Sequence, residues 1–299
     1  MNLIIKTIQM KNLQTSFRSH NELARLFTEI ILFHGDELIL DFKDVTFISA
    51  NQFSVLGCML STFQKENMST RIIFDNVPAK LENLMKTNGF GRHFSSYEPL
   101  PDIHNTTITY KIFNVSQIGE FEKYILLEIF GRNDIPKMSA MVKDSIIDNI
   151  LEIFNNVKEH TNSSSLYTCG QYFPSKSLLY FTITDSGETI PYNVLSFLKE
   201  HHMPISSSAL EWAIQSGNST RRNDSPGGLG LYLLSDFIRL NCGELYIVSG
   251  GETFEQTKRG VRYKYLDHIF PGTIVTMAFN LNDKCSYCLS NEDSSDFIF

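Results

Sequence analysis

The chain has 299 residues, of which 42% are hydrophobic and 20% charged, with 17 glycines and 9 prolines. This composition is typical of a globular protein and excludes a collagen, a low-complexity chain and a wholly disordered one. The formal net charge of −7 disfavours general nucleic-acid binding, because such binding depends on Lys and Arg side chains that neutralise phosphates.

The length predicts two domains, at about 150 residues per domain. Even the most apolar segment, Ile30 to Phe42, is interrupted by polar and charged residues, so nothing approaches the roughly 18 apolar residues of a membrane helix. The first residues carry no secretory signal. The odd number of cysteines, 5, fits reduced thiols, and the Cys285-Ser-Tyr-Cys288 pair lacks the second pair that a structural zinc normally takes. We expect a cytoplasmic protein that does not contact a membrane.

The first third of the chain alternates strands and helices. Residues 36–49 read as a buried strand and its exit loop, and the helical spacing of Phe53, Leu56, Leu60 and Phe63 predicts a helix. A strand at 71–75 and a helix opened by Pro78 follow. Two prolines in a polar setting at 97–105 mark the best linker. We therefore predict a first domain over residues 1–105, with a small sheet and helices packed on it.

The second domain is expected over residues 106–282. Strands are predicted at 107–115, 165–173, 177–184, 244–249 and 273–280, and helices at 121–130, from Ser139 onwards and at 227–240. The basic run at 258–264 reads as a solvated hairpin or loop in preference to a polyanion site. Residues 283–299 read as a flexible acidic tail. The predicted fold class is α/β or α+β.

Three groups of residues in this domain are candidates for chemistry. The first is on the helix from Ser139, where Glu152, Asn156 and His160 recur every four residues and so share one face. The second is Asp185-Ser-Gly187, at the exit of an apolar strand. The third is the glycine turn that contains Gly228 and Gly230 and opens into a helix, whose N–H groups suit a phosphate. Taken singly, each has an ordinary structural interpretation.

Together and in this order, the three groups resemble the GHKL, or Bergerat-fold, family of ATP-binding domains, which includes gyrase B, MutL, histidine kinases and anti-sigma-factor kinases. The resemblance covers about residues 135–281. Residues 152–160 look like the N box, residues 185–191 the first glycine box, residues 228–231 the second, and Gly272-Thr273 the closing strand. Neither a dinucleotide fingerprint nor a GxxxxGK[ST] motif is present.

The resemblance implies a role for each matching residue. Asn156 would offer its amide oxygen to Mg²⁺, and Glu152 would act as the catalytic general base. Asp185 would hold the adenine amino group. The other ATP-binding positions would be Gly187, Thr189, Thr220, Arg221, Gly228, Gly230, Leu231 and Thr273. Residues 216–225 would form a lid in which Arg221 and Arg222 face the triphosphate.

One position departs from the family pattern. The first box usually reads DxGxGIP, and its second glycine is Thr189 here. If that position needs a positive φ, a threonine would strain the backbone.

The first domain resembles the STAS domains of anti-sigma-factor antagonists over residues 38–94. In signalling members the turn before the helix reads Asp-Ser-Ser-Gly-Leu, and a GHKL-type kinase phosphorylates its second serine. The matching residues here run from Ser49 to Phe53, with Asn51 at the phosphoacceptor position, so that switch cannot work in this form. Ser49 and Ser54 are interpreted as turn or cap residues.

The resemblances imply a cytoplasmic regulator that binds Mg²⁺ and ATP. We expect a slow ATPase or a serine/threonine protein kinase coupled to a STAS-like module that binds a protein partner, with a homodimer possible. The alternative is a non-catalytic ATP-dependent interaction switch or an assembly component. No nucleic acid partner is expected.

Overall fold

The computed structural model describes residues 3–160, 163–204, 208–218, 220 and 230–288. Within these ranges the chain forms two sheets, a three-stranded sheet in the order β1-β2-β3 and a five-stranded sheet in the order β4-β5-β6-β8-β7. The first sheet is parallel and the second antiparallel. The fold is therefore of the predicted mixed α/β class.

The first sheet and its helices come from the N-terminal third. The elements are β1 (Ile5–Gln9), α1 (Phe17–Ile31), β2 (Glu37–Asp41), α2 (Phe53–Glu66), β3 (Arg71–Asp75), α3 (Ala79–Thr87) and α4 (Gly91–Phe94). The strand at 71–75 and the helices after Phe53 and Pro78 lie where the sequence predicts them. The sequence analysis did not identify β1 and α1.

The second sheet and its helices follow. The elements are β4 (Thr107–Asn114), α5 (Ile118–Glu128), α6 (Ala140–His160), β5 (Ser165–Phe173), β6 (Leu178–Asp185), α7 (Ile190–Glu200), α8 (Ala209–Ile214), α9 (Gly230–Leu240), β7 (Glu244–Thr257) and β8 (Gly260–Asn280). Every residue of β6 is buried, as expected of a strand with both faces covered.

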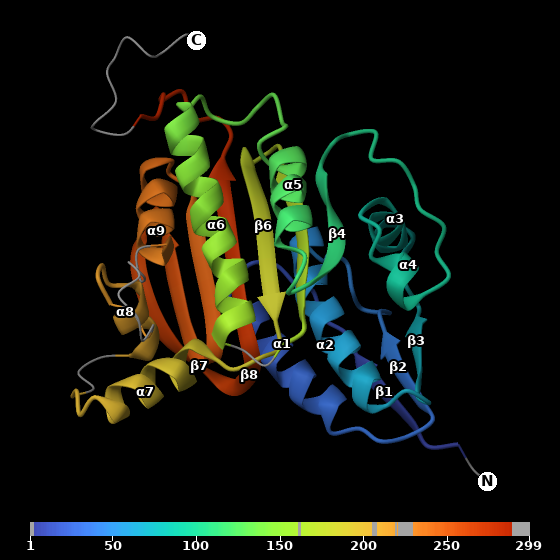
Figure 1. Cartoon of the computed structure of the whole chain (residues 1–299). Helices are drawn as coiled ribbons and strands as arrows, with labels where there is room; N and C mark the ends of the chain where they lie inside the picture. The colour runs from blue at the N-terminus through green and yellow to red at the C-terminus, as the bar shows by residue number, and fades with distance from the viewer. Residues whose placement is uncertain (1–2, 161–162, 205–207, 219, 221–229, 289–299) are drawn as a thin grey trace.

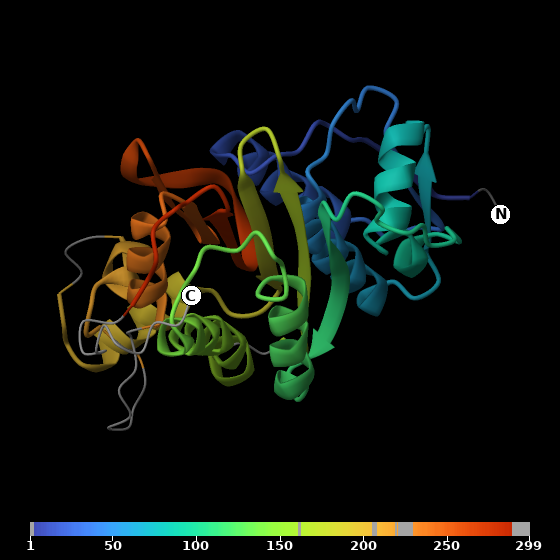
Figure 2. The ribbon, with the colours of Figure 1, turned by 90° about the horizontal axis from the view of Figure 1, so that it is seen from above.

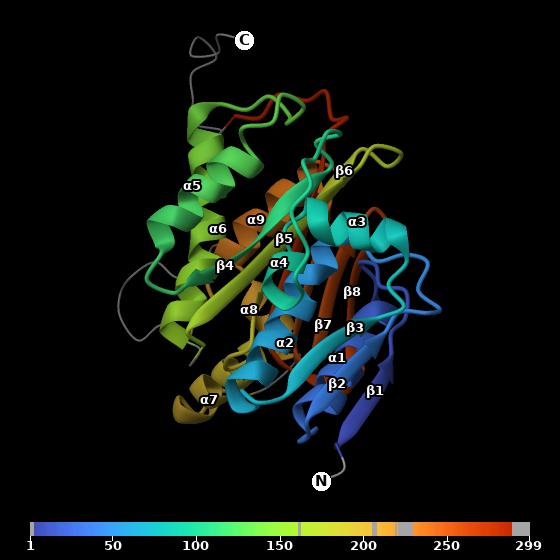
Figure 3. The same ribbon diagram turned by 90° about the vertical axis from the view of Figure 1, so that its right-hand side faces the viewer.

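The elements stack in layers, which Figures 1 to 3 show from three directions. Helices α5, α6 and α9 cover one face of the five-stranded sheet, which we call the front face (Figure 1). Helices α1 and α2 lie on the opposite, rear face (Figure 2). In Figure 3 the three-stranded sheet lies on the side of α1 and α2 that faces away from the five-stranded sheet. These two helices are therefore sandwiched between the sheets.

The sandwiched position explains the composition of α2. All residues from Phe53 to Leu60 are buried, because this helix has a sheet on each side and is apolar nearly all round. Helix α1 faces β8, where the rings of Phe27 and Phe270 lie 5.6 Å apart between centroids. One buried cluster contains side chains from both sheets. The parts of the chain before and after the predicted linker at 97–105 therefore share a hydrophobic core.

Polar contacts also join α2 and the turn before it to the rear of β5 and β6. Asn51 donates from Nδ2 to Thr182 Oγ1 at 2.9 Å, and Ser54 Oγ lies 3.1 Å from Thr184 Oγ1. Thr62 Oγ1 donates to Ser186 Oγ at 2.9 Å. These buried hydrogen bonds satisfy groups that would otherwise be costly to remove from water.

Strands β7 and β8 are longer than predicted and form a hairpin around Lys258 and Arg259. The basic run is thus part of a hairpin. The strands continue through Gly250 and Gly272, with an irregularity in register between Ser249 and Glu252.

Residues 283–288 pack on the body of the molecule, and residues 289–299 of the expected tail lie outside the described residues. Tyr287 forms an isolated bridge with Met138, and its ring lies 5.2 Å from that of Phe237 on α9. Among the described residues, no helix has the length and hydropathy needed to cross a bilayer.

Candidate functional site

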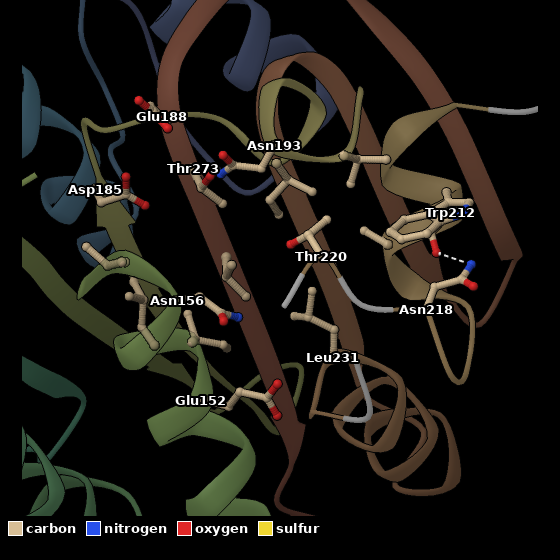
Figure 4. Close-up of a pocket in the computed structure, with 17 residues that line it drawn as sticks. Glu152, Asn156, Asp185, Glu188, Asn193, Trp212, Asn218, Thr220, Leu231 and Thr273 are labelled. Atoms are coloured by element: carbon tan, nitrogen blue, oxygen red, sulfur yellow. Dashed lines mark hydrogen bonds between the residues drawn. The ribbon is translucent and has the colours of Figure 1, made fainter. Parts of the chain in front are cut away.

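A cavity lies on the front face between α6, the carboxyl end of β6, the middle of β8, and the helices α7 and α8. Figure 4 shows its lining side chains. Six of the predicted site residues line it: Glu152, Asn156, Asp185, Thr220, Leu231 and Thr273. These residues come from five separate segments of the chain. The fold thus brings together Glu152, Asn156 and Asp185, from the first two predicted groups, and Leu231, on the helix that follows the glycine turn.

Asp185 is the last residue of β6 and is only 3% exposed. Its Oδ1 accepts a hydrogen bond from the backbone N–H of Gly187 at 2.8 Å. Burial raises the pKa of this carboxyl to about 7, against the lowering effect of the N–H groups of Gly187 and Thr273. A buried carboxyl without a cation at the inner end of a cavity is a typical feature of a functional site.

Thr273 lies next to Asp185 because β8 approaches β6 closely at Gly272. A Cβ on Gly272 would lie 2.0 Å from the carbonyl oxygen of Asp185, and its φ is +136°, so this position requires glycine. Thr273 Oγ1 lies 2.8 Å from Ser249 Oγ, which also accepts the N–H of Ile190 at 2.9 Å. Ser249 therefore connects β8 to the start of α7 beside the cavity.

Glu152 and Asn156 face Asp185 across the cavity from α6 (Figure 4). They stand one helical turn apart, so both side chains project from the same face. Both are partly exposed, and neither side chain forms a hydrogen bond or ion pair with any residue that the structure describes. A carboxylate and an amide oxygen are therefore free to bind a ligand.

The cavity combines an apolar wall with acidic groups. Its apolar side chains include Ile153, Val157, Ile183 and Val275, and such a wall suits a flat ring system. Its charged side chains are Glu152, Asp185 and Glu188, and no Lys or Arg among the described residues lines it. Since these carboxylates repel an anion, a phosphorylated ligand would enter more favourably with a divalent cation.

The remaining predicted site residues lie as follows. Gly187 contributes its N–H to Asp185. Thr189 does not line the cavity but caps α7, where its Oγ1 accepts the N–H of Tyr192. Its φ of −86° leaves the backbone unstrained, so the strain considered for this departure from the family pattern does not arise. Gly230 begins α9. Arg221, Arg222 and Gly228 lie outside the described residues.

The sequence analysis did not identify several residues that line the cavity or support it. Trp212, the single tryptophan of the chain, lines it from α8, and Asn193 lines it from α7. Asn193 follows Ile190, which also lines the cavity, by three residues, so the two side chains share one face of α7. Ser249, at the end of a predicted strand, gave no distinctive signal.

The turn that matches the STAS phosphoacceptor region is remote from the mouth of the cavity. Ser49, Asn51 and Ser54 are each no more than 2% exposed. Ser49 Oγ donates to Asn51 Oδ1, and Asn51 and Ser54 contact Thr182 and Thr184 of the five-stranded sheet. A kinase needs an accessible hydroxyl, so none of these positions can accept a phosphoryl group in the described fold.

The comparisons with known proteins give no family. A scan against models of protein families found none that matches the chain, and a search of curated proteins found no relative. A functional assignment therefore depends on the geometry and chemistry of the cavity and on the order of its motifs in the chain.

Proposed function

We propose that the cavity binds ATP together with Mg²⁺, in the manner of the GHKL family. The observation that carries this proposal is the position of buried Asp185 beside Thr273, across an apolar cavity from Glu152 and Asn156. A carboxylate at that position accepts a hydrogen bond from the exocyclic amino group of adenine, and the apolar wall contacts the ring.

The donor groups of the cavity fit a magnesium ion that is bound mainly by phosphate and water. Mg²⁺ keeps several waters and takes few protein oxygens, and Asn156 offers one amide oxygen without a described protein partner. The ion would supply the positive charge that an acidic cavity lacks for a triphosphate. Thr220, which lines the cavity, is followed directly in the sequence by Arg221.

Glu152 is placed for proton transfer at the phosphate end. Its carboxylate is one turn from Asn156, so it can orient a water or an acceptor hydroxyl and take up its proton. Because Ser49 and Ser54 are buried, the acceptor would be water or a hydroxyl of another protein. The proposed activity is a slow ATPase or a serine/threonine protein kinase that acts in trans.

The test is binding and turnover measured on the same samples. Titration of Mg-ATP, followed by the fluorescence of Trp212 and by calorimetry, should show binding to the wild type and its loss in Asp185→Asn and in Asn156→Ala. ATP turnover should vanish in Glu152→Gln, while binding survives. Wild-type protein that fails to bind Mg-ATP would refute the proposal. GTP is the control for base selectivity.

A non-catalytic switch is the second candidate, and one contact favours it. Thr62 on α2 donates to Ser186, the residue after Asp185, so the adenine end of the cavity is in contact with the N-terminal helices. A ligand that shifts Asp185 can bias these helices. Tight binding of Mg-ATP without turnover in the wild type, together with a change in hydrogen exchange over residues 53–66, would support this candidate over the enzyme.

A further inference from the structure

The part of β8 before Thr273 has no strand on the side away from β7 among the described residues. β6 pairs with β8 from Leu178–Asn280 to Asp185–Thr273 and stops there. Beyond that point β8 pairs only with β7 among the described residues, from Phe270 back to Gly260. In Figure 2 this red-orange hairpin lies at the margin of the molecule. An unpaired strand edge is a template for a further strand.

Helix α1 limits the open part of this edge. Asn21 accepts the N–H of Asp267 through Oδ1 at 2.8 Å and donates through Nδ2 to the Asp267 carboxylate. On the rear face, Lys264 Nζ lies 4.5 Å from the centroid of the Phe17 ring. The accessible edge is therefore residues 260–265, long enough for a short added strand.

The side chains along this edge combine apolar surface with positive charge. Val261 is 51%, Tyr263 36% and Tyr265 67% exposed. Cross-strand pairing with Gln256, Phe254 and Glu252 puts these three residues on one face of the hairpin. Exposed aromatic side chains beside an unpaired backbone edge are typical of a peptide-binding strand.

The tip of the hairpin, residues 257–265, contains basic but no acidic residues, so its charge is opposite to that of the whole protein. Lys264 is paired with Glu255 at 3.0 Å, whereas Lys258, Arg259 and Arg262 are exposed and have no ion-pair partner among the described residues. Three free cations suit a short acidic segment, and they are few for a nucleic acid, whose binding grows with the number of phosphates neutralised.

We propose that the edge formed by residues 260–265 binds an extended acidic segment of a partner protein by strand addition. Backbone hydrogen bonds would come from the open edge of β8. Apolar side chains of the segment would contact Tyr263 and Tyr265, and its carboxylates would lie near Lys258, Arg259 and Arg262. This interaction requires neither ATP nor the proposed enzymatic activity.

The test uses the full chain and a fluorescent peptide in which Glu and Val alternate. Fluorescence anisotropy should show salt-sensitive binding to the wild type. The triple variant Lys258→Glu, Arg259→Glu, Arg262→Glu should bind at least about tenfold more weakly, because rim charges govern such encounters. The matched control, Lys80→Glu, Lys123→Glu, Lys284→Glu, changes the net charge equally at exposed positions elsewhere and should bind as the wild type does.

Two further measurements separate strand addition from simple charge attraction. Hydrogen exchange should show protection of the amides of residues 260–265 when the peptide is bound, and Tyr265→Ser should weaken binding without altering the circular dichroism spectrum. Four results would each overturn the proposal. They are no binding of the peptide, equal binding by the two triple variants, equal binding of a peptide with Lys in place of Glu, and tighter binding of a single-stranded DNA.

Discussion

The two faces of the five-stranded sheet handle polar groups in opposite ways. On the rear face, the hydroxyls of Thr182 and Thr184 are hydrogen-bonded to side chains of the N-terminal helices. On the front face, Glu152 and Asn156 face a cavity without described partners. Polar groups that are satisfied within the protein contribute to stability, whereas unsatisfied groups around a cavity are available to a ligand.

On each face one buried titratable group makes the stability depend on pH, and the two dependences have opposite directions. Asp185 at the front has a pKa raised to about 7, and His20 at the rear has a pKa lowered to about 4, by burial first and by Lys264 second. Both shifts mean that the charged form is disfavoured in the folded protein. The two faces can therefore be compared by the effect of mutations on the free energy of unfolding and by the dependence of that free energy on pH.

The largest expected effect is the loss of packing on the rear face. Phe270→Ala should lower the free energy of unfolding by about 3–5 kcal/mol, because it removes a fully buried ring that packs on Phe27. Leu231→Ala, at the partly exposed front cavity, should cost about 1 kcal/mol or less. Urea denaturation measures both values, and equal losses would contradict the proposed difference between the faces.

The second prediction concerns the buried carboxyl. The folded protein retains the proton of Asp185 up to about pH 7, and the unfolded chain loses it near 3.8, so the wild type loses stability as the pH rises through this window. Asp185→Asn should therefore be more stable than the wild type at pH 8, by up to about 4 kcal/mol. The difference should shrink toward pH 4. A variant less stable than the wild type at pH 8 would show that the carboxylate has a stabilising partner.

The third prediction has the opposite pH dependence. Neither ring nitrogen of His20 has a hydrogen-bond partner among the residues that the structure describes, and the unfolded chain binds a proton below pH 6.5 more readily than the folded protein does. The contribution of His20 to the free energy of unfolding should rise by about 3 kcal/mol between pH 4 and pH 6.5 and then stay level. His20→Leu should abolish this rise in denaturation experiments, whereas the exposed-site control His104→Leu should keep it. Persistence of the rise in His20→Leu would assign it to other groups.

The smallest expected change in stability comes from the loss of a single polar side-chain group on each face. Thr62→Val should reduce the free energy of unfolding by about 1 kcal/mol, because it removes the partly buried hydrogen bond to Ser186, and Thr62→Ser should restore it. Asn156→Ala at the front should leave thermal stability almost unchanged while Mg-ATP binding is lost. A large loss of stability in Asn156→Ala would show that the front face is also structural.

The sequence predicted the regular elements best where one signal was strong. The continuous apolar run of β6 and the stripe of α6 gave elements at the expected positions. β1 gave a weak signal because only one of its five residues is buried. α1 was missed although Leu23, Phe27 and Ile30 recur at helical spacing and are buried, so its amphipathic stripe was a usable signal. β7 and β8 were predicted too short, because Gly250 and Gly272 look like chain breaks and here accommodate an irregular register and a close approach.

The candidate site was predictable to the extent that its motifs are local in sequence. The spacing of Glu152 and Asn156, and an acid at the end of β6, could be read directly from the chain. Trp212 could not, since it reaches the cavity only through the packing of α8 against α7 and β7. The sequence also gave no indication that the rear of the sheet is covered by the N-terminal helices.

The contact between α1 and β8 has a consequence for the order in which the chain folds. Asn21 and Asp267 are 246 residues apart in sequence, and contacts of such long range form slowly. At about 5–20 residues per second, the ribosome completes β8 roughly ten to fifty seconds after α1. During this interval α1 can pack on the three-stranded sheet, but the side of α1 that contacts β8 has no partner. The N-terminal helices are thus among the first parts to be synthesised and among the last to reach their final position.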